Sequence, residues 1–449
     1  MNAQSLVAQR KLSTTIWTQS WPLLIATAAT TLIATVDVQS AGYLGVSAQA
    51  AVGLSEQILF VFNIFVISMG VGTSAIVARS WGGNERDAAS QCAAQSLSFS
   101  IMLGITLALL LVLCAEWLVP LFTRDASVAV QSKSYLKIYA LYMVPFSALT
   151  ISNATFRGIG LPKLAAVTVV LELIINIIGD YASVGGFWLV PKFGIQGIAG
   201  ASIVGAGAAA TLAALLLGRN FDRSTFRMLP VSMREIRRIA HIGWPAAVHG
   251  IHFACSMFAI FVILRQLDRP TAALATCTIA MRINGLLFVP IMALQLAVGS
   301  IVGQCLGARE FERAYRAGWN TAQVAAIVAM AIAFCEFAFA QQIAHVFTSD
   351  ADTLAFCVNF LHIDALVRPF MAAGQILQGC LQGAGDTRGP MLILWFTNWV
   401  VRISLAWLMC LVMHAGPMGA WLSMAASAAI ASAMIAARFA AKGWMNQKV

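Results

Sequence analysis

The chain has 449 residues, of which 60% are hydrophobic and 10% are charged, and its formal net charge is +10. About a quarter of the residues of a soluble domain are charged and fewer than half are apolar, so this composition excludes an ordinary water-soluble enzyme and a disordered chain. Too few polar residues remain to cover a water-facing or nucleic-acid-binding surface. The composition therefore predicts a polytopic membrane protein with no enzymatic activity and no nucleic-acid partner.

The apolar runs divide at charged residues, glycines and prolines into twelve candidate membrane spans. A helix that crosses the bilayer needs roughly 20 apolar residues, whereas a barrel strand needs about ten in strict alternation. The runs are longer than barrel strands and do not alternate, so the sequence predicts twelve helices. In chain order they cover residues 16–42, 53–78, 88–114, 131–156, 164–187, 194–217, 239–264, 271–305, 316–343, 353–382, 389–413 and 416–437.

Basic residues are distributed unevenly between the loops. With twelve spans, both termini and every loop that follows an even-numbered helix lie on one side of the membrane. That side holds 19 of the 28 basic residues, and the opposite loops hold six. Because cytoplasmic loops carry an excess of Lys and Arg, both termini are predicted to be cytoplasmic.

The two halves of the chain share a sequence repeat. SWPLL at 20–24 returns as GWPAA at 243–247, and IVARSWGGNE at 76–85 returns as IVGQCLGARE at 301–310, at offsets of 223 and 225 residues. Collinear matches at a nearly constant offset indicate a duplication. We therefore expect two homologous six-helix bundles, an N-terminal lobe over 1–218 and a C-terminal lobe over 239–449, joined by a basic cytoplasmic linker over 219–238.

An even number of helices in each half gives both halves the same orientation in the membrane. Such parallel repeats hold their substrate site between the halves, near the middle of the membrane. This arrangement favours an alternating-access transporter over a scaffold or a channel. The sequence has no phosphate-binding G-x-x-x-x-G-K-[ST] motif, so transport is expected to use an ion gradient or a partner.

Several carboxylates fall inside the predicted spans, where a charge costs a few kcal/mol and is by default a functional-site hypothesis. Glu172, Asn176 and Asp180 follow one another at i, i+4 and i+8, which places them on one helix face. Asp37 lies deep in the first span. The carboxyl groups of Asp37 and Asp180 with the Asn176 amide could bind a proton or Na⁺, because burial and a like-charged neighbour favour a protonated carboxyl group and oxygen ligands suit a hard cation. The alternative is that each acid is a neutral, hydrogen-bonded packing residue, and for Glu336 the two readings are equally favoured.

The second half offers accessory candidates for the cavity. Asp364 and Arg368 lie one helical turn apart, so a local ion pair is the favoured interpretation. Arg402 occupies the position that matches Asp180 in the repeat and is interpreted as a structural counter-charge or a cavity residue. His249 and His252 stand at i and i+3 on one helix, and either packing or contact with substrate would explain them.

Nine cysteines are scattered singly along the chain, and none has the spacing of a metal or redox site. Two lone histidines also form no metal site. The sequence therefore predicts no cofactor and no metal, apart from a possible Na⁺ at Asp37 and Asp180.

Taken together, these motifs resemble those of the MATE (multidrug and toxic compound extrusion) transporters of the MOP flippase superfamily. The resemblance rests on SWPLL, ATVDVQSAGYLG around Asp37, FRGIGLPK, NIIGD, GIQGIAGAS, GWPAA, IVGQCLGA and LQGAGDTR, in this order along the chain. It implies a V-shaped, monomeric antiporter of the bacterial inner membrane. Such a protein exports cationic or amphipathic drugs and other toxic organic compounds in exchange for H⁺ or Na⁺.

The resemblance also assigns residues. The family's ion site in the first lobe falls on Asp37, Asn176, Asp180 and Ser202. Ser202 replaces the usual Thr and keeps its hydroxyl group. Phe253 and Met371 stand where NorM-type members have a Glu and an Asp, so the chain looks more like the DinF-like branch, with H⁺ as the preferred coupling ion. The alternative function is a flippase for a lipid-linked precursor or an exporter of one specific metabolite.

Overall fold

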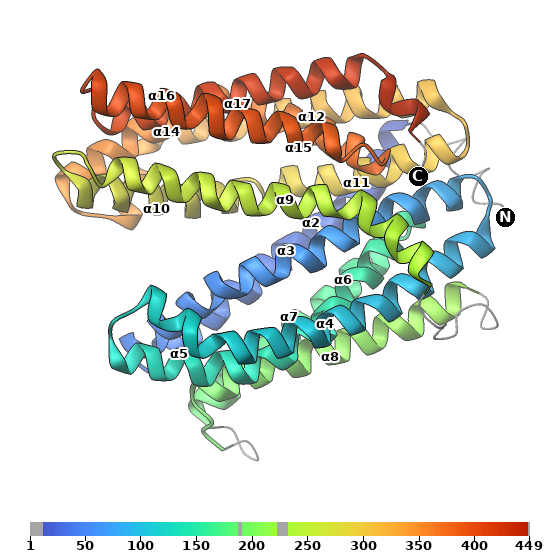
Figure 1. The fold of residues 1–449 in the computed structure, drawn as a ribbon, viewed down its shortest axis with the longest axis horizontal. Coiled ribbons are helices and arrows are strands. Elements are labelled where there is room, and N and C mark those ends of the chain that lie inside the picture. The colour runs from blue at the N-terminus through green and yellow to red at the C-terminus, as the bar shows by residue number, and fades with distance from the viewer. Residues whose placement is uncertain (1–11, 187–190, 222–231, 448–449) are drawn as a thin grey trace. The chain divides into compact units, whose positions relative to one another are not determined.

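In the computed structural model of the protein, the described residues are 12–186, 191–221 and 232–447 (Figure 1). Within these ranges every regular element is a helix. Eleven of the described helical segments are long and apolar enough to cross a membrane, and α5, η1 and α6 follow one another directly where the remaining predicted span lies. The prediction of an all-helical, polytopic membrane protein with twelve spans is confirmed.

The chain divides into two compact units. We call Trp17–Trp244 the first unit, and the described residues of Met1–Ile16 and Pro245–Val449 the second unit. The division falls inside helices α2 and α9. The predicted linker, 219–238, includes residues 222–231, which lie outside the described residues, and its last part already belongs to α9.

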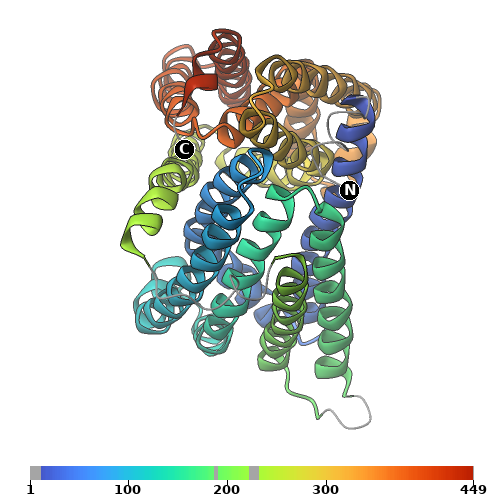
Figure 2. The ribbon, with the colours of Figure 1, turned by 90° about the vertical axis from the view of Figure 1, so that its right-hand side faces the viewer.

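Seven α-helices and one short 3₁₀ turn account for the regular structure of the first half. They are α2 (Leu12–Gly42), α3 (Val46–Gly82), α4 (Arg86–Phe122), α5 (Ala126–Tyr139), η1 (Ala140–Tyr142), α6 (Met143–Gly158), α7 (Pro162–Gly185) and α8 (Ile195–Asn220). Helices α7 and α8 pack against each other, and α6 packs against α3, α4 and α8 (Figures 1 and 2). The core of this unit includes Val66, Leu111, Tyr135 and Ile198.

The second half follows a similar order with more interruptions. Its elements are α9 (Met233–Leu264), α10 (Pro270–Leu287), α11 (Val289–Gly307), α12 (Phe311–Ala338), α13 (Ala340–Phe347), α14 (Ala351–Gly383), α15 (Arg388–Phe396), η2 (Thr397–Ile403), α16 (Ser404–Trp407), η3 (Leu408–Val412), α17 (Pro417–Ala440) and η4 (Gly443–Asn446). Helix α14 packs against α10, α11, α12 and α17 and is therefore the central helix of this unit.

Two predicted spans are less regular than the sequence suggested. Residues 271–305 were expected to form one helix, but α10 ends at Leu287 and α11 begins at Val289. Pro290 lacks a backbone N–H and cannot continue the helical hydrogen bonds, so the break falls at Phe288. The span predicted over 389–413 contains two π-helical segments, Thr397–Ile403 and Leu408–Val412.

The repeat is visible in the turns that end corresponding helices. After α3, Asn84 adopts a left-handed backbone with φ 63°, and after α11, Arg309 does so with φ 61°. In both turns the backbone N–H of the next residue donates a hydrogen bond to a carbonyl oxygen in the last turn of the helix. Glu85 N–H donates to the Ser80 carbonyl at 2.9 Å, and Glu310 N–H donates to the Cys305 carbonyl at 2.8 Å. The same backbone conformation and hydrogen bond thus end the helix at matching positions of the two halves.

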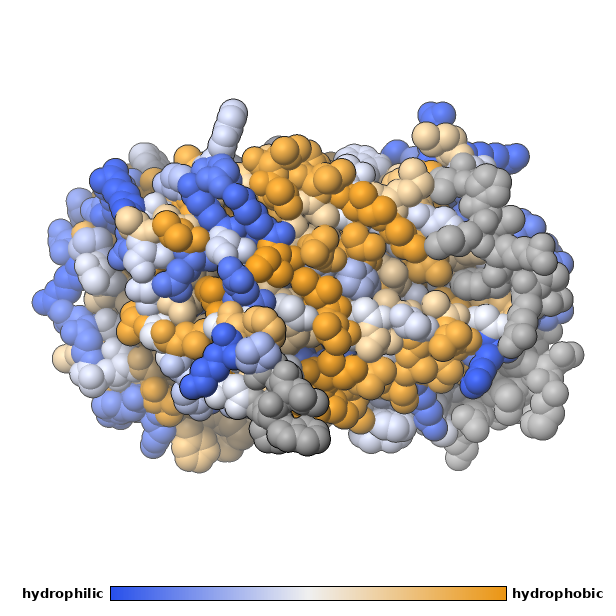
Figure 3. Space-filling model, turned by 90° about the horizontal axis from the view of Figure 1, so that it is seen from below, coloured by the Kyte–Doolittle hydropathy of each residue, from blue (hydrophilic) through white to orange (hydrophobic). Residues whose placement is uncertain are grey.

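Large apolar side chains cover much of the surface. Leu113, Trp117 and Phe334 are more than two-thirds exposed, as expected of side chains that face lipid rather than water. In Figure 3 apolar residues gather across the middle of the face, and polar residues gather towards its two ends.

Candidate ion-binding site in the first unit

Asp37 of α2 receives hydrogen bonds from two other helices. Asn176 Nδ2 on α7 donates to Asp37 Oδ1 at 3.0 Å, and Ser202 Oγ on α8 donates to Asp37 Oδ2 at 3.2 Å. Asn176 Nδ2 also lies 3.1 Å from Ser202 Oγ. All three residues are buried. Three helices therefore converge on one carboxyl group inside the unit.

Small residues allow α7 and α8 to approach closely enough for these contacts. A Cβ atom at Gly179 would lie 2.6 Å from the Ala201 Cβ, and a Cβ atom at Gly205 would lie 3.0 Å from the carbonyl oxygen of Glu172. Any larger side chain at these two glycines would separate the helices. The polar residues Asn176 and Ser202 lie between these contacts along their helices, so the close packing sets the distance between them.

Asp180 is fully buried, one helical turn beyond Asn176. It lies near enough to Asp37 and Ser40 for its carboxyl group to interact with both. Neither carboxyl oxygen of Asp180 meets hydrogen-bond geometry with a described residue, and the same holds for Asn176 Oδ1 and Ser40 Oγ. No basic side chain among the described residues pairs with Asp37 or Asp180. The site is therefore a buried, acidic group of oxygen atoms, several of which accept no hydrogen bond from a described residue.

Such a group of atoms can accept a proton or a small hard cation. Buried polar atoms without partners cost free energy, and a buried anion without a counter-charge costs more. A proton on one carboxyl group, or a Na⁺ between the oxygens, would remove both costs. Among the described residues, no group of three or more His, Cys, Asp and Glu side chains has the geometry of a metal site, so the oxygens of Asn176, Ser40 and Ser202 would have to complete any Na⁺ shell.

Three tyrosine rings in contact with one another lie beside this site and were not among the residues predicted from the sequence. Tyr135 stacks on Tyr139, Tyr139 lies 4.7 Å from Tyr142 between ring centroids, and Tyr142 OH donates to Glu172 Oε1 at 3.3 Å. Glu172 is buried and faces Tyr142 rather than joining the Asp37 group. The i, i+4, i+7 spacing of the three tyrosines was the signal available in the sequence.

The histidine and arginine candidates of the second unit lie elsewhere. His249 and His252 contact each other edge to face, with ring centroids 5.2 Å apart, and neither ring nitrogen of His252 has a hydrogen-bond partner in the described structure. Arg402 Nε donates to Ser427 Oγ at 3.0 Å, and no described carboxylate pairs with Arg402. The equivalent of the Asp180 position thus carries a buried cation rather than an acidic group.

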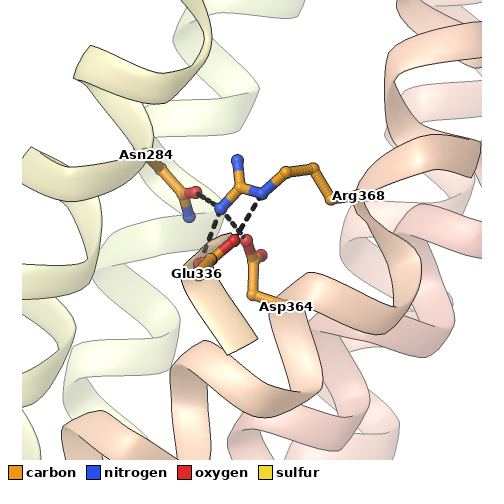
Figure 4. A network of polar contacts seen from close by, with 4 residues as sticks. All are labelled: Asn284, Glu336, Asp364 and Arg368. Atoms are coloured by element: carbon orange, nitrogen blue, oxygen red, sulfur yellow. Dashed lines mark hydrogen bonds and ion pairs between the residues drawn. The ribbon is translucent and has the colours of Figure 1, made fainter. Parts of the chain in front are cut away.

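Asp364 and Arg368 form the expected ion pair, and two further residues join it (Figure 4). Arg368 Nε donates to Glu336 Oε2 at 2.6 Å and its Nη2 donates to Glu336 Oε1 at 2.8 Å. The same Nη2 donates to Asn284 Oδ1 at 2.9 Å. Residues from α10, α12 and α14 therefore meet at one guanidinium group.

Comparison with known proteins agrees with this architecture. The MatE family model matches residues 22–182 and 245–408, one stretch in each unit. A probable multidrug resistance protein NorM of Thermotoga maritima is 25% identical over 93% of this chain and 90% of its own length. The probable multidrug resistance protein YoeA of Bacillus subtilis is 24% identical over 96% of this chain and 95% of its own length.

Solved structures share the fold. A MOP superfamily transporter from Pyrococcus furiosus superposes with a TM-score of 0.88 at 21% identity, covering 98% of this chain and 99% of that one. An outward-facing multidrug resistance transporter of the MATE family superposes with a TM-score of 0.85 at 22% identity, covering 98% of both chains. The family model covers most of both halves of the sequence, and the chain belongs to the MatE family.

Proposed function

We propose that this protein is a secondary antiporter of the bacterial inner membrane that exports cationic or amphipathic organic compounds in exchange for H⁺. Its family membership and its relatives, which are named as multidrug resistance proteins, support export of toxic organic molecules. In this proposal the protein is monomeric, both termini are cytoplasmic, and the chain is a transporter rather than an enzyme.

The proposed coupling of transport to H⁺ rests on one observation: no basic side chain among the described residues pairs with the buried carboxyl groups of Asp37 and Asp180. Two buried carboxyl groups with no counter-charge bind a positively charged species strongly, and each can hold only one at a time. Binding a proton from outside stabilises one arrangement of the site, and releasing it inside stabilises another. Exchange follows when the exported compound is bound only in the deprotonated arrangement.

We favour H⁺ over Na⁺ because Phe253 of α9 and Met371 of α14 stand where NorM-type members have a Glu and an Asp. One pair of carboxyl groups suffices for a proton. A Na⁺ ion would require several oxygens at well-defined distances, so the neutral oxygens of Asn176, Ser40 and Ser202 would have to join the two carboxyl groups around it.

The experiment is ethidium efflux from proteoliposomes, driven first by an imposed pH gradient and then by a Na⁺ gradient, with Asp37→Asn as the inactive variant. We expect efflux with the pH gradient and none from the variant. Asp352→Asn, which changes an exposed carboxylate paired with Arg269, is the matched control and should transport normally. Efflux driven by Na⁺ alone would overturn the choice of ion. Wild-type efflux from Asp37→Asn, or no efflux under either gradient from a folded protein, would overturn the antiporter and direct attention to lipid-linked precursors and single metabolites.

A further inference from the structure

The cluster of Glu336, Asp364, Arg368 and Asn284 contains one more carboxyl group than it has cations (Figure 4). Glu336 and Arg368 form a bidentate pair, which is the strongest geometry available to a guanidinium group and a carboxylate. Asp364 contacts the same guanidinium group through Nη2, which also donates to Asn284. The pair of Glu336 and Arg368 is neutral by itself, so the charge of Asp364 is in excess.

Among the described residues, no second basic side chain forms an ion pair with Glu336 or Asp364. Arg368 and Asp364 are the charged groups that act on Glu336, and Arg368 is the charged group that acts on Asp364. Asn284 is the polar group contributed by α10, and the face of Phe288 lies 5.6 Å from the guanidinium group. His362, also on α14, packs against Phe337 with ring centroids 4.4 Å apart. Arg282, on α10, is exposed.

The two carboxyl groups differ in their access to the outside of the unit. The side chain of Glu336 is 1% exposed and that of Arg368 is 2% exposed, whereas the side chain of Asp364 is 10% exposed. Glu336 uses both oxygens in the pair with Arg368. Asp364 contacts the guanidinium group through Oδ2, and the Asn284 side chain also interacts with its carboxyl group. Asp364 is therefore the carboxyl group that a species from outside can reach.

We propose that this cluster is a second proton-binding site, in which Asp364 takes up and releases a proton while Glu336 and Arg368 remain a fixed ion pair. The proton comes from water and binds a carboxyl oxygen of Asp364, which makes the cluster neutral. When the proton leaves, the excess negative charge returns and must be balanced by a charge elsewhere, because a buried net charge is costly. Uptake and release of the proton thus change the electrostatic state of the centre of the second unit.

The chemistry of the cluster favours a proton over a metal cation. A Na⁺ ion would have to lie next to the guanidinium group of Arg368, which repels it, and would need several oxygens. The amide of Asn284 has one oxygen, which already accepts from Arg368. A proton needs a single oxygen and no free volume.

The role of this site in transport rests on the proposed function, because it adds a second proton to the exchange that Asp37 and Asp180 are proposed to drive. The protonation of Asp364 itself does not depend on transport. The test therefore reads the protonated carboxyl group directly, so that a failure of the antiport proposal and a failure of this one give different results.

The experiment is difference infrared spectroscopy of the full-length protein in lipid nanodiscs, titrated between alkaline and acid pH, in the region of the protonated carboxyl stretch. We expect a wild-type band that grows with acidification and is lost in Asp364→Asn. The same band should be lost in Glu336→Gln, although Asp364 is still present, because the remaining pair of Asp364 and Arg368 is neutral. A band retained in full in Glu336→Gln, or a spectrum of Asp364→Asn identical to the wild type, would overturn the proposal.

Asp386→Asn is the matched control. Asp386 is also a buried carboxyl group of the second unit, but it forms a one-to-one pair with Arg438, with Nε and Nη2 at 2.7 and 3.0 Å from its two oxygens. Its removal should leave the band unchanged, and loss of the band there would contradict the assignment. Asp364→Glu, which keeps the acid, should shift the band and covers the case in which Asp364→Asn does not fold. Displacement of the band by Na⁺ at constant pH would identify a cation site instead and overturn the choice of a proton.

Discussion

Ser202 Oγ donates a hydrogen bond of 3.2 Å to Asp37 Oδ2, and the two residues are 165 positions apart in the sequence. The contact joins α8 to α2 and makes the carboxyl group of Asp37 part of a bond network that crosses the first unit. Its strength should influence how readily Asp37 accepts a coupling ion, because a hydrogen bond to a carboxylate stabilises the ionised form.

Replacing the hydroxyl group of Ser202 tests this contact. Removing a hydrogen bond to a charged group costs about 1.5–3 kcal/mol, so Ser202→Ala should reduce the rate of ethidium efflux under a fixed pH gradient by a factor of about ten to 150. Ser202→Thr keeps the hydroxyl group and should retain most of the rate. Ser55→Ala is the control, since the Ser55 hydroxyl donates to Ala51 of its own helix. Equal rates in Ser202→Ala and wild type would remove Ser202 from the site.

Asp180→Asn should separate stability from transport. Asp180 is buried, and neither oxygen has a hydrogen-bond partner among the described residues, so the ionised form lowers the stability of the fold. We expect the neutral amide to raise the apparent melting temperature in detergent, or at least to preserve it, while efflux is lost. A variant that melts well below the wild type would show that Asp180 has a packing role.

The close packing of α7 on α8 can be tested with a compensating pair. In Gly179→Ala the new methyl group would lie 2.6 Å from the Ala201 Cβ, and forced overpacking costs about 1–3 kcal/mol. We expect a lower melting temperature and weaker efflux. Adding Ala201→Gly should restore much of both, since it removes the clashing atom. Gly207→Ala, on α8 with no atom within 4 Å of the new Cβ, should be neutral or slightly stabilising.

A contact at the end of α14 gives a prediction for the second unit. Asp386 accepts hydrogen bonds from Arg438 and from the backbone N–H of Gly389 at 3.2 Å. A Cβ atom at Gly389 would clash with Arg438 Nε, so Gly389→Ala must displace the guanidinium group. Arg438 is partly exposed but Asp386 is buried, so we expect Gly389→Ala, which only displaces the guanidinium group, to cost about 1 kcal/mol of stability and Arg438→Ala, which leaves the carboxyl group without a counter-charge, to cost about 3 kcal/mol. Both disturb the same contact, so the double variant should melt close to Arg438→Ala alone. Additive losses would show that the two residues act separately.

Much of the fold and the acidic part of the site could be predicted from the sequence. The i, i+4, i+8 spacing of Glu172, Asn176 and Asp180 gave their common helix face, and all three are buried. Glu172 nevertheless turns to Tyr142 rather than to Asp37. A shared face does not fix the rotation of each side chain toward a particular neighbouring helix.

Contacts between helices distant in sequence could not be predicted in the same way. The spacing of Asp364 and Arg368 along one helix predicted their ion pair. The residue that accepts hydrogen bonds from both Nε and Nη2 of Arg368 is Glu336, on α12, which the spacing did not indicate. The break at Phe288 was also missed, because the apolar run passes through Pro290 without a polar residue. The hydropathy of the side chains indicates which segments can lie in lipid, but it does not show where the backbone loses a helical hydrogen bond.

The boundary between the two units lies inside α2 and α9 rather than in a loop. Ile16, near the start of α2, packs into the core of the second unit with Val298 and Ile301, whereas Gly243 of α9 lies against the Ser68 carbonyl of the first unit. A chain cut between residues 221 and 232 would thus give two fragments, each with a helical arm that belongs to the other's core. Each fragment would lack part of the helix that completes its own unit, so neither half of the duplication buries its whole core with its own residues alone.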